Sequence, residues 1–81
     1  MPKIFEWNGY RFFFFSNEGN PAENCHVHVR KGDAIAKFWI LPYVSLDSAW
    51  GMNSRELRIL EDKIYDNMEL IKEKWDEFFS K

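Results

Sequence analysis

Alternating residues on both sides of Gly32-Asp33 constrain the fold of this chain more than any other feature. Side chains along a strand point alternately to the two faces of a sheet, and a pair that begins with glycine suits the type II′ turn of a β-hairpin. The turn sorts the flanking residues into an apolar and a mixed face: Val29 with Ala36, Val27 with Phe38 and Cys25 with Ile40, against Arg30 with Ile35, His28 with Lys37 and His26 with Trp39. A shift by one residue would mix the two sets, so the pattern predicts a hairpin over residues 25–41. A turn at Lys31-Gly32 would move the partners by two residues and leave both faces unchanged.

A second hairpin is predicted at Asn8-Gly9, because a type I′ turn needs two residues that tolerate positive φ. Residues 3–7 and 10–16 form its strands. We expect these partners: Trp7 with Tyr10, Phe5 with Phe12, Lys3 with Phe14, Glu6 with Arg11 and Ile4 with Phe13. Residues 17–24 have the composition of a loop, and residues 43–46 are expected to form a short edge strand.

The C-terminal part of the chain has the period of a helix. Asn53 and Glu56 have the spacing of a capping box. An apolar residue then recurs every three or four positions: Leu57, Leu60, Ile64, Met68, Ile71, Trp75 and Phe78. The pattern predicts one long helix over residues 54–79, in which Asn67 is the place where a bend would fall.

These elements predict a single α+β domain over residues 1–81. Its sheet, over about residues 3–46, is an antiparallel β-meander of three to four strands, and one long C-terminal helix packs on one face. A straight helix of about 27 residues is about 40 Å long, which is more than a small sheet covers. We therefore expect the last turns to overhang and to contact a second copy or a partner through Trp75, Phe78 and Phe79.

Composition narrows the class of protein. The formal net charge is -2, which argues against binding nucleic acid over the whole surface, although residues 1–40 hold five basic and four acidic side chains. The longest apolar runs, such as residues 12–15, are too short to span a bilayer, and no leader is evident. The single cysteine fits a reducing compartment. We expect a cytoplasmic protein that does not associate with membranes.

The mixed face of the hairpin carries candidate chemistry. Two strand residues of one face lie about 7 Å apart, so His26 and His28 form a compact cationic patch with Lys37 and Arg30. One histidine as general base, the other as general acid, and Lys37 or Arg30 as the stabilising charge would make a metal-independent, ribonuclease-like phosphodiesterase. The catalytic candidates are thus His26, His28 and Lys37, and the substrate-binding candidates are Arg30 and Trp39, the latter by stacking on a base.

Structural roles are the alternative for the same residues. His26 would then pack on Trp39, and both imidazoles would make hydrogen bonds within the fold. We expect no cofactor and no metal site: His26 and His28 supply two ligands, Cys25 points to the opposite face, and zinc would need Glu23 or a partner's carboxylate. Cys25 itself is expected to be a small buried hydrophobe.

Several stretches together resemble a known family. They are Met1-Pro2-Lys3-Ile4, Asn20-Pro21 followed by His26-Val27-His28-Val29, Ala36-Lys37-Phe38-Trp39, and the late Trp75 and Phe78. The chain resembles the small bacterial proteins of the domain-of-unknown-function 4160 family, although the family usually has two prolines where this chain has Asn24-Cys25. The resemblance implies a bacterial protein encoded beside a second small protein, its expected partner, as in a toxin–antitoxin module.

Two functional hypotheses follow. In the first, the chain is a toxin–antitoxin component whose histidine-bearing face binds or cleaves RNA. In the second, it is a non-catalytic protein-interaction or oligomerisation module. The sequence leaves open whether the protein is an enzyme.

Overall fold

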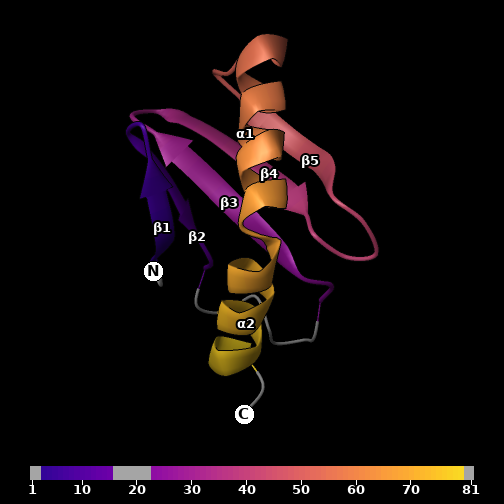
Figure 1. Cartoon of the computed structure of the whole chain (residues 1–81). Helices are drawn as coiled ribbons and strands as arrows, with labels where there is room; N and C mark the ends of the chain where they lie inside the picture. The colour runs from indigo at the N-terminus through magenta and orange to yellow at the C-terminus, as the bar shows by residue number, and fades with distance from the viewer. Residues whose placement is uncertain (1–2, 16–22, 80–81) are drawn as a thin grey trace.

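The computed structural model describes residues 3–15 and 23–79 as an α+β fold. Its elements are β1 (Lys3–Trp7), β2 (Tyr10–Phe13), β3 (His26–Lys31), β4 (Ala34–Trp39), β5 (Ser45–Trp50), α1 (Ser54–Asp66) and α2 (Met68–Phe79). The strands form one antiparallel sheet in chain order, and both helices lie on the same face of it (Figure 1). The predicted loop over residues 17–24 lies outside the described residues except for its last two.

The two predicted turns and the central register are confirmed. Asn8 and Gly9 have φ values of 51° and 84°, as a type I′ turn requires, and Gly32 has a φ of 60°. The six partners along β3 and β4 include His26 with Trp39 and His28 with Lys37. Beyond the strands, the Ile40 amide donates to the Cys25 carbonyl at 2.8 Å. The Gly32-Asp33 turn is therefore the one that forms.

The first hairpin matches its predicted register only near the turn. Trp7 faces Tyr10, and Phe5 faces Phe12 at a ring-centroid distance of 4.2 Å. Lys3, however, faces Phe13, so the predicted partners of Lys3 and Ile4 are wrong. The cause is a bulge, in which Ile4 is an extra residue on β1 without its own partner on β2.

The predicted three to four strands are wrong, because β5 adds a fifth strand that continues past residue 46. A second bulge interrupts the alternation of this strand, which is why its sequence does not show the pattern of a strand. Lys37 faces Ser48 but Phe38 faces Leu46, so Asp47 is the extra residue. The Trp39 indole N–H donates to Asp47 Oδ1 at 3.0 Å, which holds the bulged residue against β4.

The predicted single long helix is also wrong, because α1 ends at Asp66 and α2 begins at Met68. The break lies at Asn67, where a bend was anticipated. In a continuous helix the Asn67 amide would donate to the Lys63 carbonyl. Instead, Nδ2 of the Asn67 side chain donates to the Lys63 carbonyl oxygen at 2.8 Å. The Asn67 backbone amide donates to the Ile64 carbonyl at 3.1 Å. Competition of this kind is the usual reason that Asn interrupts helices.

The start of α1 follows the predicted capping box. The Glu56 amide donates to Asn53 Oδ1 at 2.8 Å, and the Asn53 amide donates to Glu56 Oε1 at 3.2 Å. The Tyr10 hydroxyl also donates to the Glu56 carboxylate, which links β2 to the first turn of α1. This hydrogen bond, with burial, raises the pKa of Tyr10 to about 12, and it is also the main reason that the pKa of Glu56 is lowered.

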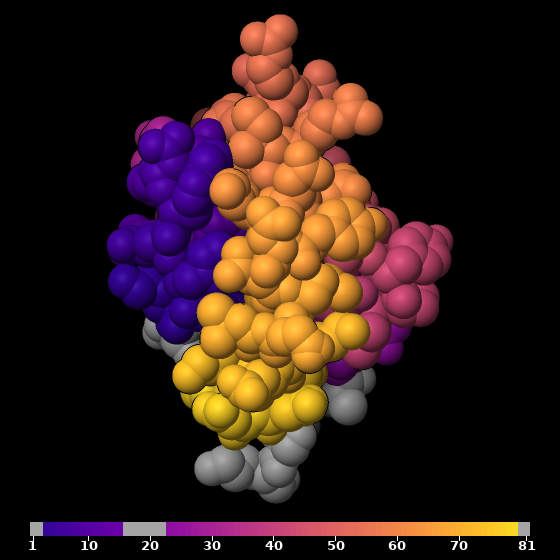
Figure 2. Space-filling view, viewed as in Figure 1, coloured from indigo at the N-terminus to yellow at the C-terminus, as the bar shows by residue number. Residues whose placement is uncertain are grey.

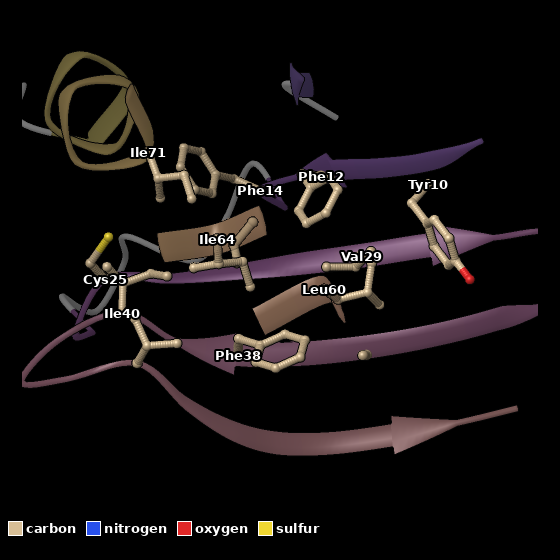
Figure 3. Packing of buried hydrophobic residues seen from close by; sticks show 13 residues of the cluster. Tyr10, Phe12, Phe14, Cys25, Val29, Phe38, Ile40, Leu60, Ile64 and Ile71 are labelled. Atoms are coloured by element: carbon tan, nitrogen blue, oxygen red, sulfur yellow. The ribbon is translucent and has the colours of Figure 1, made fainter. Parts of the chain in front are cut away.

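The core lies between the helices and the sheet (Figure 3). Its central side chains are fully or almost fully buried: Phe12, Val27, Val29, Phe38, Leu60, Ile64 and Ile71. Cys25 is buried at one end of this cluster, as predicted, and burial raises the pKa of its thiol to about 12. Cys25 therefore packs as an apolar side chain and is not an activated nucleophile.

Candidate functional site

The sheet face opposite the helices carries the chemistry predicted for the central hairpin. Its side chains alternate along each strand with those of the core. We call it the histidine face, defined by Arg11, Phe13, His26, His28, Arg30, Ile35, Lys37, Trp39, Ser48 and Trp50 of the strands and by Phe15, which follows β2 and contacts His28. All five residues predicted from the hairpin for catalysis or substrate binding lie on this face.

Two arginines face each other across neighbouring strands of the histidine face. Arg11 on β2 is the register partner of Arg30 on β3, and Arg30 is in turn opposite Ile35. Like charges placed directly opposite each other are destabilising in a sheet. Arg30 Nε is buried, and within the part of the chain that the structure describes it has no hydrogen-bond partner. An external anion such as a phosphate, which guanidinium groups bind, would offset the repulsion between the two arginines.

His26 is enclosed by other rings and is 0% exposed. Its ring centroid lies 5.2 Å from Trp39, 5.1 Å from Trp75 and 5.4 Å from His28. His26 Nδ1 lies 2.9 Å from the Asn24 carbonyl oxygen, and a carbonyl can only accept, so Nδ1 carries the hydrogen. These contacts match the structural alternative for His26. A general acid or base must reach the reacting proton at about 2.6–3.2 Å, which a ring without exposed surface does not do.

His28 lies between aromatic rings and is 7% exposed. Its ring centroid is 5.7 Å from that of Phe13 and 4.3 Å from that of Phe15. Unlike His26, it lines a surface hollow, described below, so a ligand in that hollow would lie beside its ring.

Lys37 faces His28 in the register, but its ammonium group interacts with a tryptophan. Lys37 Nζ lies 4.3 Å from the centre of the Trp39 ring, a cation–π distance. The indole N–H of Trp39 is taken by Asp47. Lys37 and Trp39 therefore form a small unit of their own, in which Lys37 offers a positive charge at the surface.

A hollow of about 280 Å³ lies on the histidine face between Phe15 and Trp50. Its lining also includes His28, Ile35, Lys37 and Ser48. Trp50 is 67% exposed, which is unusual for so large an apolar side chain on a folded domain. The hollow is thus lined by two aromatic side chains, Phe15 and Trp50, and by the cationic side chain of Lys37.

Sequence reasoning missed Arg11, Phe15 and Trp50 as members of this site. The sequence predicts only a pairing with Glu6 for Arg11 and only a place in the strand over residues 10–16 for Phe15. Trp50 could have been found if residues 45–50 had been recognised as a strand, because Trp50 is then the partner of Ile35. The bulge at Asp47 removed that signal.

The predicted interface residues lie at the end of α2. Trp75 and Phe79 pack on the chain's own Phe14, at ring-centroid distances of 5.1 and 5.7 Å, whereas Phe78 is 40% exposed. Their role in binding a partner stays a prediction.

Two further features bear on the kind of site. Among residues 3–15 and 23–79, no three His, Cys, Asp or Glu side chains come together in an arrangement that could hold a metal ion. In the same part of the chain, neither helix combines the length and the hydrophobicity needed to cross a membrane.

Comparison with known proteins identifies the family. The family model described as "Domain of unknown function (DUF4160)" matches residues 9–76, from the turn of the first hairpin to within α2. No curated protein and no solved structure matches the chain significantly. Because the match covers most of the 81 residues, the chain belongs to the DUF4160 family.

Proposed function

We propose that the histidine face binds single-stranded RNA without cleaving it. The observation that carries the proposal is the hollow between Phe15 and Trp50, which lies beside the facing arginines. A base would stack in the hollow, and the phosphates that flank it would contact Arg11, Arg30 and Lys37. Aromatic surfaces next to basic side chains are how proteins commonly bind single strands.

Stacking is supported by the exposure of Trp50. An apolar ring in water gains free energy when another flat surface covers it, and a nucleobase offers such a surface whatever its sequence. Trp50 and Ile35 are register partners, so the ring stands on β5 directly beside the floor of the hollow. The proposal therefore predicts little sequence preference.

Phosphate binding is supported by the charges of the histidine face. Arg11, Arg30 and Lys37 lie on three adjacent strands. Glu6 is the register partner of Arg11, but its carboxylate also lies 3.6 Å from Lys3 Nζ. Asp47 accepts the hydrogen bond from Trp39. The positive charge is thus local, in a chain whose net charge is -2.

Binding is favoured over cleavage because the two histidines do not form an accessible acid–base pair. His26 is enclosed by Trp39, Trp75 and His28. His28 alone lines the hollow, and one histidine is not enough for a mechanism that needs a base and an acid on opposite sides of a phosphorus atom. We therefore assign His26 to positioning the rings of the face, and His28 to contact with the ligand.

The test of stacking is fluorescence anisotropy with a labelled, mixed-sequence oligoribonucleotide of about 10 nucleotides. Loss of one base–aromatic stack of about 1–3 kcal/mol should weaken binding roughly 5- to 150-fold in Trp50→Ala, and Trp50→Phe should retain most of the affinity. The matched control is Tyr65→Ala, which removes an exposed aromatic side chain from α1. Equal affinities of Trp50→Ala and the wild type would refute the proposal.

The test of phosphate contact is the dependence of affinity on salt. The binding constant K falls as salt is added, and each phosphate contact with a single strand increases the magnitude of the negative slope of log K against log salt concentration by about 0.7. Arg11→Ala should lower this magnitude by about that amount, and Lys74→Ala, which makes the same change of charge on α2, should not. Equal effects of the two substitutions on the salt dependence would mean that the histidine face has no special role in phosphate contact.

Cleavage is tested directly by incubating the RNA with excess protein. Intact RNA is expected for the wild type. Cleavage by the wild type that disappears in His28→Ala would replace the binding proposal by the catalytic one.

The proposal also includes the toxin–antitoxin context, which is supported by the family resemblance alone. An RNA ligand agrees with the expected cytoplasmic location. Expression of this chain alone should alter growth. Expression together with its genomic neighbour should yield a complex of the two proteins. Unchanged growth without a complex would remove this part of the proposal and leave RNA binding to its own tests.

A further inference from the structure

We propose that two copies of this chain associate through the outward faces of their α1 helices, which pack antiparallel about a two-fold axis. The surface lies on the opposite side of the molecule from the histidine face, so the inference is independent of RNA binding. Figure 2 shows the outward side of α1 in the upper part of the helical face.

The first support is the order of charges along α1. Its outward positions carry Arg55 and Arg58 in the first half and Asp62 and Asp66 in the second, and all four are exposed. Spacings of three and four residues place them on one side of the helix. Among the described residues, none of the four makes an ion pair. The surface is thus positive at one end and negative at the other.

This order is the reverse of what a solitary helix favours. The partial charge of a helix is positive at its N-terminus and negative at its C-terminus, so Arg55 in the first turn and Asp66 in the last are both unfavourably placed. The side chains with favourable signs, Glu56 and Lys63, are used within the chain. Glu56 accepts from Tyr10 and Asn53, and Lys63 Nζ lies 4.7 Å from the centre of the Trp7 ring.

A second copy supplies the complement of this pattern. In an antiparallel pair with the axis near residue 60, Arg58 lies next to Asp62 of the second copy, and Arg55 lies next to Asp66 of the second copy. The two-fold axis repeats each contact, as in any isologous interface. A parallel pair would bring like charges together, so the pattern selects the antiparallel arrangement.

The second support is apolar surface beside these charges. Ile59 and Tyr65 on α1 are 41% and 52% exposed. A groove of about 820 Å³ separates α1 from β5. Its apolar lining residues are Phe38, Leu46 and Leu57, of which Leu46 is 44% exposed, and its polar lining residues are Ser54, Arg55, Arg58, Glu61 and Asp62. A domain of this size buries a limited share of its apolar surface by itself. Side chains of the second copy would cover Ile59 at the axis and part of the groove.

The test is sedimentation velocity of the full chain over a wide range of concentrations. We expect a monomer–dimer equilibrium that weakens with added salt, because exposed ion pairs are screened. Arg58→Glu should raise the dimer Kd about ten-fold or more, because it places a carboxylate next to Asp62 of the second copy. Asp62→Arg should do the same. The double variant Arg58→Glu/Asp62→Arg should restore the dimer.

Two more samples make the test specific. Lys74→Glu changes the charge of α2 by the same amount as Arg58→Glu changes that of α1 and should leave the Kd unchanged. A chain with both arginines 55 and 58 changed to Glu, and a chain with both aspartates 62 and 66 changed to Arg, should each be monomeric and should form a one-to-one dimer when mixed. A wild type that is monomeric at every concentration, or a double variant that remains dissociated, would overturn the proposal.

Discussion

α2 is the element whose attachment can be weakened by a single substitution. Ile71 is its one fully buried side chain among the described residues, and Trp75 and Phe79 add partly buried contacts to Phe14. A helix of 12 residues is too short to persist in water without packing. We therefore predict that Ile71→Ala detaches and unfolds α2 while α1 and the sheet stay folded.

The magnitude follows from burial. Replacing a fully buried isoleucine by alanine costs about 2–5 kcal/mol, and replacing it by valine costs about 0.5–1.5 kcal/mol. The two aromatic contacts of α2 to Phe14 add about 0.5–1.5 kcal/mol each beyond the area that they bury. The whole domain should have a free energy of unfolding of about 4–12 kcal/mol, at roughly 0.05–0.15 kcal/mol per residue. Ile71→Ala thus removes a large share of what holds α2 and a smaller share of what holds the domain.

The assay is native-state hydrogen exchange followed by NMR for the wild type, Ile71→Val and Ile71→Ala. In the wild type, α2 amides should exchange through an opening of lower free energy than the opening that exposes β3. In Ile71→Val this opening should be more frequent. In Ile71→Ala, α2 should lose protection entirely, whereas β3 and β4 keep their dispersed native signals.

The contrast variant is Ile64→Ala, which removes an equally buried side chain from α1. It should lower the protection of the sheet and of both helices together. If α2 and β3 amides have the same opening free energy in the wild type and remain equally protected in Ile71→Ala, α2 is not a separate unit and the reasoning is refuted.

Two other predictions concern the link between α1 and the sheet. Asn53→Ala should lower the free energy of unfolding in urea by about 0.5–2 kcal/mol, whereas Asn53→Ser should cost much less because serine also caps helices; equal losses would contradict the capping role. The raised pKa of Tyr10 means that the unfolded chain loses this proton near pH 10 and the folded chain near pH 12. Stability should therefore fall as the pH rises through this range, and the fall should be smaller in Tyr10→Phe, as thermal melts in alkaline buffers can check.

The parts of the fold that were predictable from sequence are those determined by residues that lie close together in the chain. The register of β3 and β4 follows from one turn and from the alternation around it, and the start of α1 follows from Asn53 and Glu56. The strand β5 was not predictable in this way, because the bulged Asp47 breaks its alternation. The end of α1 depends on one side chain, that of Asn67, which competes with its own backbone amide for the Lys63 carbonyl. The apolar pattern continues past Asn67 without interruption, so it does not mark this end.

The candidate site shows the same division. Alternation placed His26, His28, Arg30, Lys37 and Trp39 on one face. It could not tell that His26 is buried, because a ring that encloses it, Trp75, belongs to α2 and reaches the site only after the chain turns at Asn67. The hollow depends likewise on the unrecognised strand that carries Trp50.

The order of strands in the sheet has a consequence for how the chain folds. Each strand pairs with the strand that precedes or follows it in the chain, so the sheet can grow one strand at a time by pairing neighbouring segments. Both helices follow the sheet in the chain. During synthesis the strands therefore leave the ribosome first, and the apolar face formed by Phe12, Val29 and Phe38 stays uncovered until α1 and α2 arrive. This interval is the period in which the growing chain is most prone to aggregate and most in need of a chaperone.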